Sequence, residues 1–244
     1  MSIPIAIICG QSKSGKDTLG NYLVEKFGGV RISLADPLKS AVQSMFGLPD
    51  DVWWGGSEDR NKNYEGINKV LQWNHPIVKD IDIKLLLDWL VQFKDGFTPR
   101  KVLQTFGTEV VRSFNPDLWV EIAIKTSLSL LNGGYEYDKK DGLIPNPKAT
   151  APGLVVISDG RFRNEILKVK AIGGTAIKIY RPNSDSSTPT AGMPNHSSEL
   201  EISGIPGHFF DVEVKNDGSL DVLKEKGYVI GTEYLHLDKP KHIL

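Results

Sequence analysis

Cysteine is nearly absent from this sequence. The single cysteine, Cys9, cannot form an intrachain disulfide, and its place inside an apolar run predicts a buried, unreactive thiol. The five histidines are scattered and never reach the spacing of a zinc site. A G-x-S-x-G nucleophile motif is also missing. These absences argue against a disulfide-stabilised fold, a zinc centre and an α/β-hydrolase.

A strong charge excess and a long hydrophobic run are missing as well. The 29 Lys and Arg residues and 30 Asp and Glu residues leave a net charge of −1, which argues against nucleic acid or a membrane as a partner. No apolar window reaches the ~18 residues of a membrane span, and signal-peptide features are lacking. With 40% hydrophobic residues in 244, we expect a compact, cytoplasmic protein.

Short apolar runs recur along the chain and alternate with helical or loop segments. The first run is followed by a glycine-rich stretch and then by residues 17–27, where Leu19, Leu23 and Phe27 share a helical face. No two-residue hairpin turn joins the runs, which favours an α/β fold with a parallel sheet flanked by helices. The predicted strands are residues 3–9, 30–34, 154–158, 175–180 and 211–214.

A long, mainly helical block separates the second and third predicted strands and exceeds an ordinary crossover. Its predicted helices are residues 82–93, 99–114 and 117–131. We therefore predict a helical substrate-binding insertion at residues 49–131, within a core formed by residues 1–48 and 132–230. Within that core, residues 132–153 are predicted to form an exposed loop or hairpin and residues 182–206 a lid or a plain surface loop. Residues 231–244 are predicted to form a surface tail.

The segment after the first predicted strand matches the phosphate-loop pattern G-x-x-x-x-G-K. Glycines let backbone N–H groups turn inward, and the next helix N-terminus attracts an anion, so ATP is the expected ligand. Lys16 would then act as a catalytic residue that follows the transferred phosphoryl group. The alternative is a glycine-rich turn capped by Ser14 or Asp17. The ATP-binding candidates are Gly10, Lys13, Ser14, Gly15, Lys16, Asp17 and Thr18.

The loop departs from the general motif directly after its lysine. Asp17 stands where a hydroxyl residue is usual, and the hydroxyl follows one position later in Thr18. A carboxylate beside polyphosphate is repelled unless a cation intervenes. Either Asp17 acts through Mg²⁺ or its water shell, or it turns away and Thr18 lies near the metal, which we favour.

Charged residues follow the third predicted strand as Asp159, Arg161 and Arg163. Because ligands bind at the carboxyl ends of parallel strands, these residues should share an edge with the phosphate loop. Asp159 could hold Mg²⁺ through water or contact substrate, and the two arginines could act as catalytic residues that stabilise the transferring phosphoryl group. Alternatively, Asp159 caps the next helix and the arginines pair with Glu165 on the surface.

Phosphoryl transfer also needs an acceptor. Asp36 could bind its sugar or base and Lys39 its phosphate, although Asp36 fits a helix cap before a proline equally well. Gln104 and Arg112 are polar candidates within the helical block. Trp119 is either a core residue or a stacking face for a base.

Two later elements complete the candidates. His196 and Glu199 lie in the candidate lid loop, where Glu199 could contact substrate and a lone histidine is usually a surface residue. Asn216 lies in the turn after the last predicted strand; the turn is its expected main role, with an adenine contact as a second.

Several motifs in this order resemble the deoxynucleoside monophosphate kinases of tailed bacteriophages: GQSKSGKDT, LADPLK, LQTFGTEVVR, DLWV, VVISDGRFRNE, GGTAIKIYRP, HSSE and VKNDGSL. The resemblance implies a P-loop kinase fold with strand order 2-3-1-4-5. It implies that MgATP phosphorylates a deoxynucleoside 5′-monophosphate for DNA precursor synthesis, in the host cytoplasm for a phage-encoded chain. It makes Lys16 the loop lysine, Arg161 and Arg163 phosphate or transition-state contacts, and Arg112 a monophosphate or base contact. The family also carries aspartate after the loop lysine, like Asp17.

The expected partners are therefore ATP and a deoxynucleoside monophosphate, with a homodimer as a further prediction. The alternatives are another small-molecule P-loop kinase, similar to dephospho-coenzyme A kinase or phosphomevalonate kinase, and a nucleotide-binding switch without catalysis. The preferred base stays open.

Overall fold

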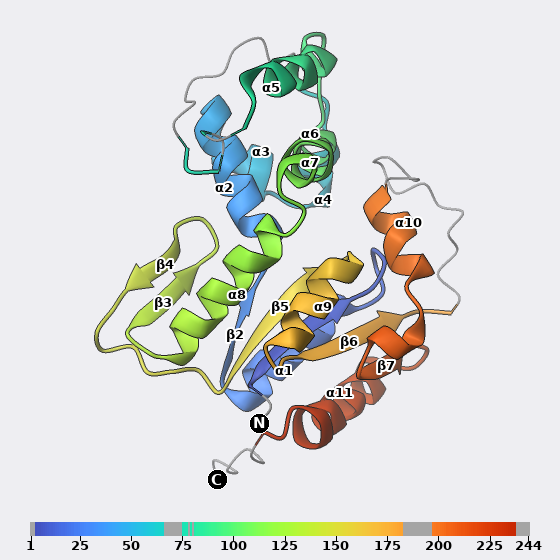
Figure 1. The fold of residues 1–244 in the computed structure, drawn as a ribbon. Helices are drawn as coiled ribbons and strands as arrows, with labels where there is room; N and C mark the ends of the chain where they lie inside the picture. Colours follow the sequence, from blue (N-terminus) through green and yellow to red (C-terminus); the bar gives the residue numbers. More distant parts are fainter. Residues whose placement is uncertain (1–2, 66–74, 78, 80, 183–196, 238–244) are drawn as a thin grey trace. The chain divides into compact units, whose positions relative to one another are not determined.

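The computed structural model describes residues 3–65, 75–77, 79, 81–182 and 197–237 (Figure 1). The chain forms two compact units. Unit 1 comprises Met1–Leu34, Val120–Ser187 and Ser197–Leu244, and unit 2 comprises Ala35–Trp119 and Thr188–His196. The limits differ from the predicted insertion of residues 49–131, because α2 belongs to unit 2 and most of α8 to unit 1.

Unit 1 is built on a five-stranded parallel sheet. Its order, β2-β5-β1-β6-β7, is 2-3-1-4-5 when only the strands of this sheet are numbered, so the predicted order is confirmed. The central strand β1 is fully buried, with Ile7 opposite Ile157 and Ile8 opposite Ile177 in its two neighbours. The strands are β1 (Ile5–Cys9), β2 (Gly29–Ile32), β5 (Leu154–Gly160), β6 (Thr175–Tyr180) and β7 (Val212–Lys215).

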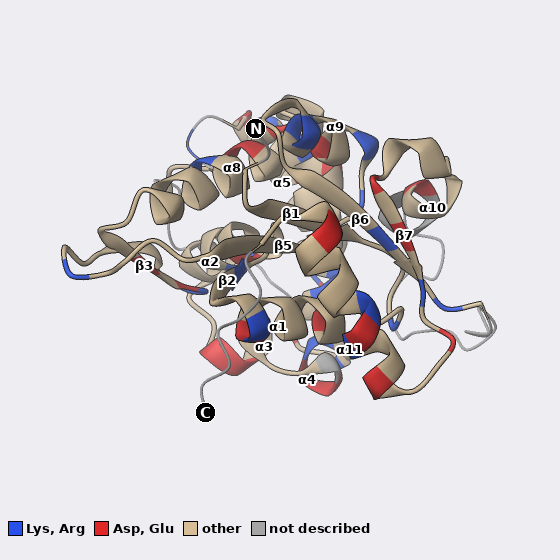
Figure 2. Cartoon of the chain, turned by 90° about the horizontal axis from the view of Figure 1, so that it is seen from below, with Lys and Arg blue, Asp and Glu red and all other residues tan. Residues whose placement is uncertain are grey.

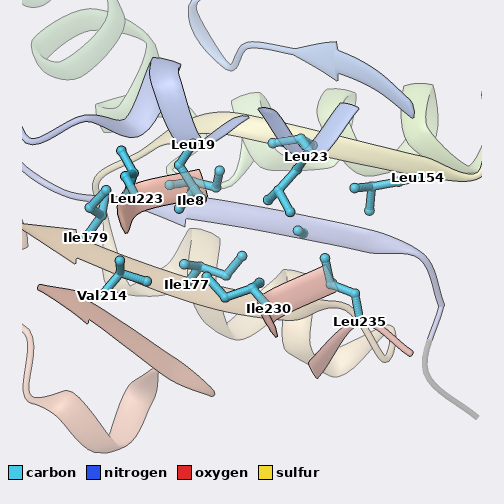
Figure 3. Close-up of a cluster of buried hydrophobic side chains, with 12 residues drawn as sticks. Ile8, Leu19, Leu23, Leu154, Ile177, Ile179, Val214, Leu223, Ile230 and Leu235 are labelled. Atoms are coloured by element: carbon cyan, nitrogen blue, oxygen red, sulfur yellow. The ribbon is translucent and has the colours of Figure 1, made fainter. Parts of the chain in front are cut away.

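Helices cover both faces of this sheet. On one face lie α1 (Lys16–Phe27) and α11 (Leu220–Val229), and on the other α8 (Leu118–Leu131) and α9 (Arg163–Ala171), as Figures 1 and 2 show from two directions. Figure 2 also marks basic and acidic residues along these helices, in keeping with the near-zero net charge. The core beneath α1 and α11 is drawn in Figure 3 and contains Ala6, Ile8, Leu19, Leu23, Leu154, Val156, Ile177, Ile179, Val214, Leu223, Ile230 and Leu235.

The predicted surface tail begins later than residue 231. The chain continues from α11 into a π-helical turn, η4 (Ile230–Tyr234), and Leu235 is only 3% exposed in the core. A Cβ on Gly231 would lie 2.2 Å from the Phe27 ring, so the chain is tightly packed here. Residues 238–244 lie outside the described part.

The other predicted loops have regular structure where they are described. Residues 132–153 contain an antiparallel hairpin of β3 (Tyr135–Asp138) and β4 (Gly142–Pro145). The candidate lid loop ends in α10 (Ser197–Gly204), followed by η3 (Gly207–Phe209), whereas residues 183–196 lie outside the described part.

Unit 2 is helical, as the sequence predicts, and packs around aromatic side chains. Trp89 contacts the rings of Phe46, Phe93 and Phe106, and Trp53 contacts Phe46. The predicted helix at 99–114 is interrupted by a wide π turn. The elements are α2 (Ala35–Phe46), α3 (Asp50–Trp54), α4 (Ser57–Asn61), α5 (Ile83–Leu90), η1 (Val91–Phe93), α6 (Pro99–Thr105), the π-helical η2 (Phe106–Val111) and α7 (Arg112–Phe114).

Two features are absent from the described residues. None of their helices has the length and apolar character that crossing a membrane requires. Within the same ranges, histidine, cysteine and carboxylate side chains nowhere gather in threes that could hold a metal ion.

Candidate active site

The phosphate-loop motif forms the turn between β1 and α1, at the carboxyl edge of the unit 1 sheet. A Cβ on Gly10 would lie 2.2 Å from the carbonyl oxygen of Ile179 in β6, so only glycine fits there. Gly15 has φ +103° and Lys13 has φ 62°, so the backbone curls through conformations that most residues avoid. Successive N–H groups in such turns form anion-binding concavities.

The start of α1 adds further donors to this loop. Its N-cap residue is Gly15, and no side chain caps this end of the helix, which is the kind of helix end that suits an anion. Ser14 is 3% exposed, and its Oγ has no hydrogen-bond partner among the described residues. A buried hydroxyl without a partner is unfavourable, and a phosphate oxygen would satisfy it. The loop therefore fits a polyphosphate.

The loop lysine lies over the loop itself. Lys16 is 8% exposed, and its Nζ donates a hydrogen bond of 2.6 Å to the carbonyl oxygen of Gln11. Gln11 in turn donates through Nε2 to Ser203 Oγ of α10 at 2.8 Å. The Lys16 ammonium group is thus held against the backbone of the phosphate loop.

Asp17 and Thr18 differ in their surroundings. Asp17 Oδ1 accepts from Arg31 Nη1 at 2.8 Å, and the Asp17 side chain is 81% exposed. This ion pair directs the carboxylate toward β2. Thr18 is also exposed on the first turn of α1, one position further along. A carboxylate beside a polyphosphate needs a neighbouring cation, and the Arg31 guanidinium supplies one for Asp17.

Asp159 joins the ends of two strands. Its Oδ2 accepts from Ser33 Oγ at 2.6 Å, and its Oδ1 accepts from the Leu34 backbone N–H at 2.7 Å. Both donors follow β2, so the carboxylate ties the carboxyl ends of β2 and β5 together. It also lies at the same sheet edge as the phosphate loop, because Cys9 at the end of β1 pairs with Gly160.

The segment after β5 turns into α9 through a buried carboxylate. Glu165 is 3% exposed, and its Oε2 accepts from the backbone N–H groups of Arg161 and Phe162 at 2.8 and 2.9 Å. The predicted alternative had Glu165 pairing with the arginines on the surface, whereas the Glu165 carboxylate is buried and accepts from the backbone. The Phe162 N–H and the Glu165 carboxylate form one half of a capping box, but Phe162 has no side-chain acceptor for the other half, so the sequence carries no capping-box signal here.

Arg163 has a neighbour that the sequence did not predict. Its guanidinium carbon lies 4.1 Å from the ring centroid of Phe209 in η3. Its backbone N–H donates to Glu201 Oε1 of α10 at 3.2 Å. Arg163 is exposed and Arg161 half-buried.

Asn216 lies beneath the phosphate loop. It is 4% exposed, and its Nδ2 donates to the Ser14 carbonyl oxygen at 2.9 Å. The sequence predicts a turn residue, with an adenine contact as a second role; in the structure the amide donor binds the loop backbone. The two residues are 202 positions apart, so the contact is invisible to local sequence patterns.

Unit 2 carries the candidate acceptor residues. Asp36 is 8% exposed and lies in the first turn of α2, with its Oδ1 3.6 Å from Lys39 Nζ, which also lies over the Trp54 ring. Gln104 Oε1 is buried with no hydrogen-bond partner among the described residues. Trp119 is 5% exposed and donates from Nε1 to the Gly107 carbonyl oxygen at 3.1 Å.

The structure describes some of the remaining predicted residues. Arg112 begins α7 and is half-buried. Glu199 lies in α10, but its side chain, like His196, is outside the described part. Cys9 is a buried free thiol, as predicted; burial, with a smaller effect of the nearby Glu165 carboxylate, raises its pKa well above the ordinary value.

Comparison with known proteins adds a further finding. A family model described as deoxynucleotide monophosphate kinase matches residues 58–227. A protein of Acanthamoeba polyphaga mimivirus named "Putative deoxynucleotide monophosphate kinase" is 30% identical over 185 residues, which cover 75% of this chain and 78% of that protein. The deoxynucleotide monophosphate kinase of Enterobacteria phage T4 is 22% identical over 265 residues, covering 91% and 96% of the two chains. A solved dephospho-CoA kinase from Campylobacter jejuni aligns with a TM-score of 0.44 and 15% identity, over 96% of this chain and 98% of that one.

Proposed function

The chain belongs to the deoxynucleotide monophosphate kinase family, and on that premise we propose that it transfers the γ-phosphoryl group of ATP to a deoxynucleoside 5′-monophosphate. The observation that carries the proposal is the phosphate loop at the sheet edge, with a buried lysine and an unpartnered Ser14 hydroxyl. Family membership favours this activity over another small-molecule kinase and over a non-catalytic switch.

The donor nucleotide would bind in unit 1. The N–H groups of the loop and of the first turn of α1 would hold its phosphates, and Ser14 Oγ would donate to one of their oxygens. Lys16 Nζ would leave the Gln11 carbonyl and accompany the transferred group, because its ammonium charge offsets the charge that the phosphoryl oxygens carry. Gly10 and Gly15 are needed for the loop conformation, because a Cβ would lie 2.2 Å from the Ile179 carbonyl oxygen at position 10 and 2.5 Å from Asn216 Nδ2 at position 15.

Mg²⁺ is the metal that this chemistry uses, and it would neutralise phosphate charge during transfer. Thr18 would supply a hydroxyl ligand from the first turn of α1. Asp159 would act through water, since both its carboxylate oxygens already accept hydrogen bonds from the segment after β2. Asp17 is the weaker candidate because Arg31 pairs with its carboxylate.

The acceptor nucleotide would be recognised by residues of unit 2. Lys39 and Arg112 are suited to its phosphate, Asp36 to its sugar or base, and Gln104 and Trp119 to its base. The buried, unpartnered Gln104 Oε1 supports a polar ligand. Glu199 stays a prediction from sequence. The acceptor phosphate is already an anionic nucleophile, so the residues need to align it rather than to deprotonate it.

Arg161 and Arg163 would stabilise the transferring group from the end of β5. The capping carboxylate of Glu165 orients the Arg161 backbone, and the Phe209 ring supports the Arg163 guanidinium. A homodimer and a cytoplasmic location remain predictions from the sequence, and sedimentation of the purified chain would test the first.

Coupled measurement of ADP release tests the activity. The four deoxynucleoside monophosphates, their ribonucleotide counterparts and dephospho-coenzyme A are offered with MgATP. We expect at least one deoxynucleoside monophosphate to give the fastest turnover and the corresponding diphosphate as product. Phosphorylation of dephospho-coenzyme A alone, or ATP binding without any phosphorylated acceptor, would reject the proposal.

The variant Lys16→Ala tests the assigned centre. We expect kcat to fall by about 100-fold or more, because a charge that acts on the transferring group is lost, with little change in the melting temperature. The matched control is Lys26→Ala, which removes an exposed lysine from the last turn of the same helix. Wild-type turnover in Lys16→Ala would contradict the role.

A further inference from the structure

Asn216 occupies a rigid position at the end of the edge strand β7. It is 4% exposed, and its backbone N–H donates to the Tyr180 carbonyl oxygen of β6 at 2.8 Å. Lys215 before it is paired with Tyr180 in the sheet register. The side chain of Asn216 therefore projects from a backbone that the sheet holds in place.

The Asn216 amide fits closely against the phosphate loop. Its Nδ2 donates to the Ser14 carbonyl oxygen at 2.9 Å, in a buried hydrogen bond. A Cβ on Gly15 would lie 2.5 Å from the same Nδ2, so the amide fills the space that a side chain would need. The Asn216 amide thus contacts both residues of the Ser14–Gly15 peptide.

The direction of this peptide decides what the loop offers to a ligand. In a planar trans peptide the carbonyl and the following N–H point in opposite directions. The Ser14 carbonyl points to Asn216, so the Gly15 N–H points to the opposite face of the loop. That face is the one left for an anion.

We propose that Asn216 is a positioning residue, which holds the Ser14–Gly15 peptide in the orientation that binds the phosphates of ATP. The inference rests on the proposed kinase function and assigns Asn216 a role through the loop in place of a contact with adenine. An aspartate at this position would set a carboxylate oxygen against the Ser14 carbonyl, so the amide donor, and not the side-chain volume, is the required feature.

The test measures the Kd of MgATP by calorimetry together with kcat and the KM for the deoxynucleoside monophosphate. We expect Asn216→Ala to weaken MgATP binding about tenfold and to lower kcat, with the acceptor KM changed by less than about twofold. Asn216→Asp keeps the volume without the donor and should weaken binding at least as much. Asp217→Asn is the matched control, because Asp217 is exposed and pairs with Lys215 and Lys226.

A double-mutant cycle with Gly15→Ala gives a readout that general destabilisation would not move. The strained φ at position 15 is the same in both backgrounds and cancels, whereas the clash with Nδ2 exists only when Asn216 is present. We expect the loss of MgATP affinity caused by Gly15→Ala to be about threefold or more smaller in the Asn216→Ala background.

The outcomes separate this inference from the proposed function. A wild-type chain that does not bind MgATP would overturn both. A wild-type chain that binds MgATP, with an unchanged Kd in Asn216→Ala and Asn216→Asp, would overturn the positioning role alone. A lower melting temperature with an unchanged Kd would show a purely structural residue, and the same conclusion would follow from additive effects in the cycle.

Discussion

Two neighbouring residues of α1, Asp17 and Thr18, have different surroundings within one helical turn. Asp17 and Thr18 were both candidates for Mg²⁺ on sequence grounds. The ion pair of Asp17 with Arg31 occupies its Oδ1, whereas the Thr18 hydroxyl is exposed on the same turn. The choice depends on which way each side chain leaves the helix, and that direction is set once α1 packs on the sheet.

A magnesium titration distinguishes the two residues. We expect Thr18→Ala to raise the Mg²⁺ concentration for half-maximal rate about tenfold at fixed ATP, because a direct hydroxyl ligand is lost. Asp17→Asn should leave that concentration within about twofold. The reverse pattern would assign the metal contact to Asp17.

The structure also shows contact partners that the sequence did not predict. The sequence identified Asp159 and Arg163 as charged groups near the loop, but not Ser33 and Phe209, which contact them. Those partners come from distant parts of the chain, and neither has a sequence pattern that links it to its charged neighbour. The sequence therefore predicted that these charged residues follow β5, but it did not predict which side chains contact them.

At the scale of elements, the start of α9 determines how the segment after β5 is presented. The carboxylate of Glu165 accepts two backbone N–H groups that the helix cannot satisfy itself. Since one of these groups belongs to Arg161, the cap also orients a proposed catalytic residue.

Removal of this cap should affect stability and catalysis together. For Glu165→Ala we expect the free energy of unfolding to fall by about 2–3 kcal/mol, because one buried and one partly buried N–H group lose a charged acceptor. We also expect a lower kcat. Urea denaturation and steady-state kinetics check both, with Lys168→Ala as the control: Lys168 lies on the same helix in an exposed pair with Glu121 and should cost less than about 1 kcal/mol. An equal loss in the control would contradict the prediction.

The turn of the β3–β4 hairpin contains a carboxylate that accepts two backbone hydrogen bonds. Asp138 Oδ1 accepts from the backbone N–H groups of Lys140 and Asp141 at 2.7 and 3.1 Å. These hydrogen bonds, together with smaller effects of the neighbouring lysines, lower the pKa of Asp138 below its ordinary value of 3.8. A lowered folded-state pKa means that the carboxylate stabilises the fold above about pH 3.8 and loses this contribution as the pH falls through the folded value.

Denaturation of Asp138→Ala across a pH series tests this prediction. We expect the variant to be less stable than wild type near neutral pH, and the difference between them to shrink as the pH falls below 3.8. Asp138→Asn, which keeps an oxygen acceptor but no charge, should show a smaller difference with the same trend. A difference that is independent of pH would show that the charge is not involved.

For the whole molecule, the phosphate loop and most of the residues proposed for the acceptor belong to different units; Glu199 is an exception, because Ser197–Leu244 is part of unit 1. The phosphate loop, Asp159 and Arg161 belong to unit 1, and Asp36, Lys39 and Arg112 belong to unit 2. Each unit has its own buried core, so nucleotide binding to one unit can be followed through its effect on stability.

Thermal unfolding with nucleotide provides a measurement on the intact chain. A ligand at about 100 times its Kd adds about 2.7 kcal/mol to the free energy of unfolding of the state that binds it. We therefore expect saturating MgATP to raise the melting temperature by about 5 °C or more. Lys16→Ala at the same concentrations should show a smaller shift, and Mg²⁺ without nucleotide should show none. Equal shifts in both proteins would place the nucleotide elsewhere.

The sequence by itself determined the α/β class, the strand order through its family resemblance, the phosphate loop and the helical character of residues 82–131. Apart from the strand order, these features follow from local pattern: apolar runs, helical periodicity and the glycines of one turn. The limits of the two units were not predictable from local sequence. Packing, rather than composition, assigns α2 and the first residues of α8 to unit 2.

Only the tertiary structure decided which side chains act on the phosphate loop. Asn216 reaches Ser14 across 202 positions, Gln11 reaches Ser203, and Asp159 binds the segment after β2. The physical reason is that a parallel sheet gathers the carboxyl ends of strands that are far apart in the chain, and the hydrogen bonds formed there depend on spatial neighbours rather than on sequence neighbours.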